Sequence, residues 1–262
     1  MVSLRNTLLV AATVCLAAGQ DARGQSPAPE ASSLAGATQL VVVTTSGWDS
    51  TSGELRRFTR AGVHSTWRRV GSVVPIVVGR TGLAWGVGFD RFAAGAGPIA
   101  GPRKREGDGK SPAGIFPLDT AFGFAPRDST GWISLPYVSL SPESECVDDS
   151  ASVHYNTVVD RGVVPHVDWQ SAEHMREVAQ YRLGVIVGYN AAPPVKGRGS
   201  CIFFHIWGGP TSTTVGCTAM DATELKQLVA WLDPRRKPVV VQVPAGVYLR
   251  LRREWGLAPF VR

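Results

Sequence analysis

Short runs of β-branched and apolar residues alternate along this chain with connections rich in glycine and proline. Such runs, bounded by turn-forming residues, predict β-strands. The expected strands are 40–45, 67–70, 73–78, 181–189, 201–207 and 239–243, with a long glycine-rich connection over 95–114. Several short strands with few helices favour a mainly β fold, arranged as a β-sandwich or as barrel-like sheets.

Helical periodicity is confined to two segments. Asp221 and Glu224 have the spacing of a capping box, and apolar residues then recur at helical spacing until Pro234. This pattern predicts a helix over 222–232, with Leu225, Leu228, Val229 and Leu232 on its buried face. A second helix is expected over 171–177.

The N-terminal region has the pattern of an export signal. Arg5 precedes an apolar stretch that is too short to span a membrane comfortably, which predicts a signal peptide over 1–24. Residues 25–38 are expected to form a disordered lead-in, 39–245 a catalytic domain, and 246–262 a C-terminal extension of that domain. No other stretch approaches membrane-spanning length, so we expect no transmembrane segment in the mature chain.

The charge balance suits an anionic partner outside the cell. The formal charge is +6, and removing 1–24 takes away Arg5, Asp21 and Arg23, which leaves +5. A basic exported protein suits an anionic envelope polymer, although most scattered Lys and Arg residues are simply solvated surface. The net charge is the only feature that favours nucleic-acid binding, and the predicted export argues against such binding.

Cys217 is the strongest chemical candidate. It follows Gly216 and lies twelve positions after His205, which ends an apolar run. In this arrangement His205 takes the proton, Cys217 becomes the nucleophile, and the N–H groups of Gly216 and Cys217 form an oxyanion hole. We expect such a thiol to be accessible and to have a lowered pKa. The alternative is that both side chains only pack in the core.

An odd number of cysteines remains after the signal peptide: Cys146, Cys201 and Cys217. In an oxidising compartment at least one of them stays free or pairs elsewhere. We favour a Cys146–Cys201 disulfide, which leaves Cys217 available. The alternative, in which all three stay reduced, is left open because spacing does not give connectivity.

Other chemistries find little support. Gly109-Lys110-Ser111 lacks the earlier glycine of a phosphate-binding loop, and no Gly-x-Ser-x-Gly elbow occurs. Zinc ligands are conceivable, but no His-Glu-x-x-His pattern occurs, so we expect no metal and no cofactor. The side chains that could bind zinc are those of His154, His166, Asp168 and His174.

The segment around Cys217 resembles the L,D-transpeptidase catalytic domain (the YkuD type), in which a histidine is followed by Ser/Thr-His-Gly-Cys. His205 matches the family's general base, Thr214 its Ser/Thr, Gly216 its glycine and Cys217 its nucleophile. Val215 stands where a second histidine is common, and no Arg or Asn follows Cys217, which indicates a divergent branch. The stretch 105–116, which contains the pattern at 111–116, also resembles the family's (S/T)-P-x-G-x-(F/Y) region. The segments 147–149, 154–156 and 171–175 resemble segments of the same divergent group, and the resemblance extends over about 39–244.

The resemblance implies an exported peptidoglycan-modifying acyltransferase that works on stem peptides through a Cys217 thioester. An L,D-carboxypeptidase or endopeptidase that hydrolyses the same thioester is the alternative, and a non-catalytic cell-wall-binding domain is another. We expect a monomer in the periplasm or cell envelope. Candidate substrate-binding residues are Thr214, Trp207, Gly208, Tyr155 and Asn156, although an aromatic side chain beside a core strand more often only packs.

Overall fold

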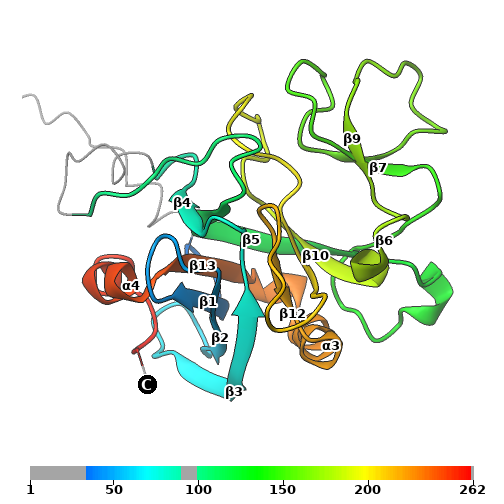
Figure 1. Ribbon diagram of the computed structural model, residues 1–262. Helices are drawn as coiled ribbons and strands as arrows, with labels where there is room; N and C mark the ends of the chain where they lie inside the picture. The colour runs from blue at the N-terminus through cyan, green and yellow to red at the C-terminus, as the bar shows by residue number, and fades with distance from the viewer. Residues whose placement is uncertain (1–33, 90–98, 261–262) are drawn as a thin grey trace, which may run out of the picture.

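The computed structural model describes residues 34–89 and 99–260 (Figure 1). The predicted signal peptide and most of the predicted lead-in lie outside these residues. Within the lead-in range, Leu34 and Ala37 are buried, and the Thr38 amide donates to the Arg236 carbonyl. Packing against the domain therefore starts before Gln39.

The described strands form mainly one large sheet that closes on itself. Its order is β10-β11-β12-β3-β2-β1-β13-β5-β4, and β10 also pairs with β5, which closes a barrel-like ring. Strands β4 and β6 pair with β5 outside this ring. The bounds are β1 Gln39–Thr45, β2 Ser52–Thr59, β3 Arg68–Val77, β4 Leu83–Trp85, β5 Ser111–Gly123, β6 Tyr137–Ser139, β10 Leu183–Val187, β11 Phe203–Ile206, β12 Thr218–Met220 and β13 Val239–Pro244. The mainly β, barrel-like prediction is confirmed.

The core is built around the parallel pair β1 and β13, in which every residue is buried. Their near-continuous valine content is typical of strands that are covered on both faces. Helix α4 (Ala245–Leu251) packs against this pair, and α3 (Ala222–Trp231) packs against β10 and β11. The Tyr248 hydroxyl donates to the Ala258 carbonyl, so the C-terminal segment folds onto the same barrel.

Helix α3 matches its prediction closely. The Asp221 carboxylate accepts from the Thr223 amide as the N-cap, and the predicted apolar face is buried. The two strands predicted over 67–70 and 73–78 form the single strand β3. Gly71 lies within it at φ 70°, where the pairing of β3 with β2 shifts register. The short 3₁₀ helices are η1 Arg127–Ser129, η2 Ala179–Arg182 and η3 Pro234–Arg236. The end of η2 takes the place of the start of the strand predicted over 181–189.

A smaller sheet lies beside the barrel, in the order β8-β7-β9. Its bounds are β7 Ser144–Val147, β8 Val158–Asp160 and β9 Ala172–His174, and Figure 1 shows β7 and β9 together away from α3 and α4. The helix predicted over 171–177 is wrong, because β9 pairs along β7 with Glu173 opposite Cys146. A disulfide between Cys146 and Cys201 ties this sheet to the barrel, as favoured from the sequence.

Candidate active site

Two neighbouring parallel strands bring His205 and Cys217 together. Phe204 pairs with Thr218 and His205 with Ala219, so Cys217, just before β12, lies opposite Phe203. The Phe203 amide donates to the Cys217 sulfur at 3.3 Å. Since side chains alternate along a strand, His205 and Phe203 share one face of β11. His205 and Cys217 line the same cavity.

The backbone of Cys217 is held by two hydroxyl groups. Thr214 Oγ1 donates to the Cys217 carbonyl at 2.6 Å, and Ser111 Oγ donates to the same carbonyl at 2.8 Å. The Ser111 hydroxyl also accepts from the Gly79 amide, and the Thr214 hydroxyl accepts from the Gly216 amide. The backbone at Cys217 is therefore held from two directions, and Ser111, the first residue of the stretch 111–116, makes one of these contacts.

The Gly216 amide differs from its predicted use. It already donates to Thr214 Oγ1 at 3.1 Å, so this donor holds the turn before Cys217 in the resting protein. Of the two amides predicted for an oxyanion hole, the Cys217 amide is therefore the better candidate donor.

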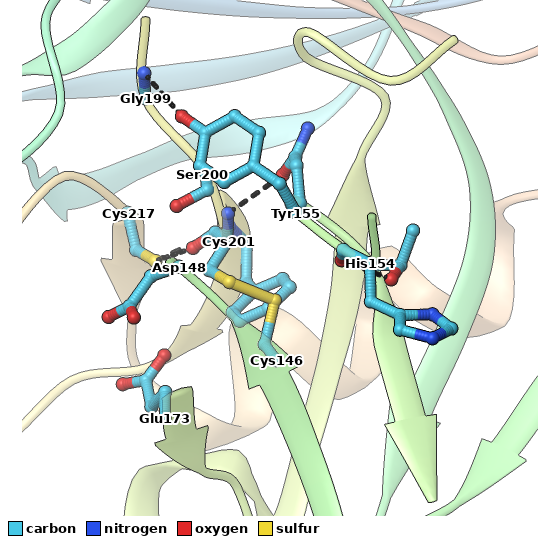
Figure 2. Close-up of a disulfide and its surroundings, with 12 residues drawn as sticks. Cys146, Asp148, His154, Tyr155, Glu173, Gly199, Ser200, Cys201 and Cys217 are labelled. Atoms are coloured by element: carbon cyan, nitrogen blue, oxygen red, sulfur yellow. Dashed lines mark hydrogen bonds between the residues drawn. A yellow bond between two sulfur atoms is a disulfide. The ribbon is translucent and has the colours of Figure 1, made fainter. Parts of the chain in front are cut away.

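The thiol is buried rather than accessible. Cys217 is 2% exposed and belongs to an apolar cluster that includes Phe122, Phe203 and Tyr181. Burial raises the pKa of the Cys217 thiol to about 12, the charge of Glu173 adds to the increase, and the Phe203 amide opposes it. The expectation of an accessible thiol with a lowered pKa is wrong, because loss of hydration outweighs the stabilising contacts. At neutral pH the group is a thiol, and it donates to the Cys201 carbonyl at 3.4 Å (Figure 2).

His205 is neutral and oriented. Its Nδ1 lies 2.8 Å from the Ile206 carbonyl, which only accepts, so Nδ1 carries the proton and Nε2 carries a lone pair. Burial lowers the pKa of His205, which favours this neutral form. A backbone-fixed neutral imidazole is the form in which histidine acts as a base.

Sequence reasoning missed two residues of the site, Tyr181 and Glu173. The Tyr181 ring lies against His205, with centroids 5.2 Å apart, and its hydroxyl donates to Glu173 Oε1 at 2.8 Å. Tyr181 also packs in the same apolar cluster as Cys217. The predicted resemblance covered the segment of Glu173, but only the strand pairing of β9 carries its carboxylate to the thiol.

Two cavities meet at Cys217. One, of about 220 Å³, lies on the His205 side, and the other, of about 380 Å³, lies on the side of Lys104 and Arg80. Val215, Cys217 and Glu173 line both. Among the predicted substrate-binding residues, those lining the smaller cavity are Thr214, Trp207 and Gly208.

Tyr155 and Asn156 are placed differently from the prediction. Neither lines a cavity at Cys217. Tyr155 is 1% exposed, and its hydroxyl bonds Glu106 and the Gly199 amide (Figure 2). Asn156 bonds the backbone of Tyr189, Asn190 and Cys201. Both side chains hold the loop before β11 in place and do not form walls of the cavities at Cys217.

Within the described ranges, no group of three or more His, Cys, Asp or Glu side chains is arranged to hold a metal ion. No helix among residues 34–89 and 99–260 has the length and apolarity to cross a bilayer.

The site is thus a cysteine and a neutral histidine that a closed, barrel-like β-sheet presents to one shared cavity. Residues 54–241 match the L,D-transpeptidase catalytic domain family, YkuD. Because the match covers most of the chain, the protein belongs to this family, whose domains act on the cell wall. Comparisons with curated proteins and with solved structures gave no match.

Proposed function

We propose that this protein is an exported L,D-transpeptidase that rearranges peptidoglycan stem peptides through a thioester on Cys217. The observation that carries the proposal is the juxtaposition of Cys217 and neutral His205 at a shared cavity, within a domain of this family. The Cys146–Cys201 disulfide and the signal-like N-terminus support export.

In the first half-reaction, the Cys217 sulfur attacks the carbonyl carbon of meso-diaminopimelate in a tetrapeptide stem. The amide bond from this residue to D-Ala is the bond that breaks. His205 Nε2 takes the thiol proton as the S–C bond forms, and the Cys217 amide stabilises the oxyanion. His205 then returns the proton to the nitrogen of the departing D-Ala. Proton transfer accompanies attack, because burial disfavours a preformed thiolate.

In the second half-reaction, an amine of a neighbouring stem attacks the thioester, forms the new amide and releases Cys217. Water in place of the amine would give a carboxypeptidase or endopeptidase.

Mass analysis of muropeptides after incubation of purified protein with disaccharide-tetrapeptides tests the proposal. We expect cross-linked dimers and free D-Ala in equimolar amounts, because each transpeptidation releases one D-Ala. Tripeptide with free D-Ala but no dimer would identify a hydrolase. Unchanged tetrapeptide would refute both and leave a wall-binding domain.

A further inference from the structure

The proposed cycle leaves one group at the thiol without a task, the Glu173 carboxylate. Glu173 lies at the centre of β9, directly opposite Cys146 of β7, whose disulfide to Cys201 fixes this edge of the small sheet against the barrel. It is one of the residues shared by the two cavities at Cys217. In the view of Figure 2, the Glu173 side chain lies next to that of Asp148, on the side of the disulfide where Cys217 lies. A disulfide-anchored strand therefore presents this carboxylate to the two cavities that Cys217 lines.

Tyr181 orients the carboxylate. Its hydroxyl donates to Glu173 Oε1 at 2.8 Å, and burial raises the pKa of Tyr181 well above its usual value, so this hydroxyl stays a donor. Oε1 is thereby engaged, and Oε2 is the oxygen left for a ligand.

Proton counting in the second half-reaction requires two acceptors. A primary amine has a pKa of about 10.4, so the acceptor arrives as an ammonium ion. It gives up one proton before it attacks the thioester and a second as the amide forms. Only one of these protons returns to the sulfur that is released. His205 is a single base and accounts for that one.

We propose that Glu173 takes the other proton, acting as the base that converts the acceptor ammonium into the attacking amine. This role rests on the proposed function. The Glu173 carboxylate removes a proton from the ammonium, and the amine nitrogen then forms a bond to the thioester carbon. The C–S bond breaks, His205 passes the second proton to the sulfur, and Glu173 releases its own proton to solvent through the larger cavity.

The surroundings suit this task. Burial raises the pKa of Glu173, the charge of Asp148 raises it further, and the Tyr181 hydrogen bond opposes the increase. A carboxylate with a raised pKa is a stronger base. The charged groups facing Glu173 from other elements are Asp148, after β7, and the larger cavity's Arg80, Lys104 and Glu106. Lys104 is paired with Asp108 at 2.6 Å, so the charge of Arg80 stands against three carboxylates in this lining, those of Asp148, Glu173 and Glu106, and the balance favours an ammonium ion.

The test separates the two half-reactions. Full-length protein is acylated with a tetrapeptide stem, excess donor is removed, a primary-amine acceptor stem is added, and the thioester is followed by intact mass. In Glu173→Gln we expect acylation within about threefold of wild type and aminolysis slower by about 10²-fold or more. The matched control Glu177→Gln, an exposed carboxylate on the same segment, should behave as wild type.

The pH profile and a second variant distinguish a base from a merely structural residue. In wild type, aminolysis should fall as pH drops below the raised pKa of Glu173, and this limb should vanish in Glu173→Gln. Glu173→Asp, which keeps a carboxylate, should restore part of the aminolysis rate. Aminolysis in Glu173→Gln at the wild-type rate, or an equal loss of acylation and aminolysis, would overturn the proposal. Absence of any thioester in wild type would refute the proposed function itself, and this role with it.

Discussion

At the scale of single residues, the resting site is a pair of neutral groups rather than an ion pair. Burial raises the pKa of Cys217 and lowers the pKa of His205, so each effect favours the uncharged form. A buried thiolate–imidazolium pair would have to overcome the desolvation of both ions. Under the proposed function, the proton therefore moves from Cys217 to His205 during attack rather than before it.

His205→Gln tests this proton transfer. Wild-type acylation needs the unprotonated ring, and the lowered pKa of His205 keeps that form present below pH 6.5, so the rate should stay level through pH 6.5 and fall only at more acidic pH. The variant should be slower by about 10²–10⁴-fold at neutral pH.

The variant should also speed up continuously as pH rises towards the thiol pKa of about 12, since hydroxide then generates the thiolate. The measurement is the acylation rate by intact mass between pH 5 and pH 10. Superimposable profiles for the two proteins would assign His205 a purely structural role.

Thr214 offers a second test at this scale. Its hydroxyl bonds both the Cys217 carbonyl and the Gly216 amide. Thr214→Val removes both bonds, each with a net value of about 0.5–1.5 kcal/mol, and should lower the acylation rate by loosening the nucleophile. Thr214→Ser keeps the hydroxyl and is the matched control. Equal rates in the two variants would show that this hydroxyl does not position Cys217.

At the scale of elements, the disulfide joins the small sheet to the strand region that leads to His205. Intact-mass counting of exported protein should give one free thiol per chain, that of Cys217. Replacing Cys146 and Cys201 together by serine should lower the free energy of unfolding by about 2–4 kcal/mol, measured by urea denaturation. A count of three free thiols in exported material would contradict this account of the small sheet.

Elements whose signals are local were predictable, and those that depend on distant partners were not. Helix α3 follows from Asp221 and the apolar spacing that comes after it, all within one segment. The segment at 171–177 also looked helical, yet Glu173 and its neighbours pair with β7, about 27 residues earlier in the chain. Tertiary pairing there overrides local propensity.

At the scale of the whole molecule, barrel closure assembles the site from segments far apart in the sequence. Cys217 and His205 could be found from their motif, since they flank one short connection between β11 and β12. Ser111, Tyr181 and Glu173 join the site around Cys217 only because β5, η2 and β9 converge on β11 and β12. The burial of Cys217, and with it the raised pKa, likewise depends on this convergence and could not be predicted from the motif.

The most direct test of the account is to find the acyl group on the protein. Full-length wild type, Cys217→Ala and Cys217→Ser are incubated with a tetrapeptide stem, quenched in acid and mapped by peptide mass spectrometry. Cys217→Ala removes about one methylene's worth of buried volume, a cost of about 1 kcal/mol, so it should remain folded.

The account predicts that wild type carries the donor acyl group, less D-Ala, on Cys217 as a hydroxylamine-labile thioester, and that Cys217→Ala carries none and releases no D-Ala. Release of D-Ala by folded Cys217→Ala, or an acyl group on any other residue, would contradict it.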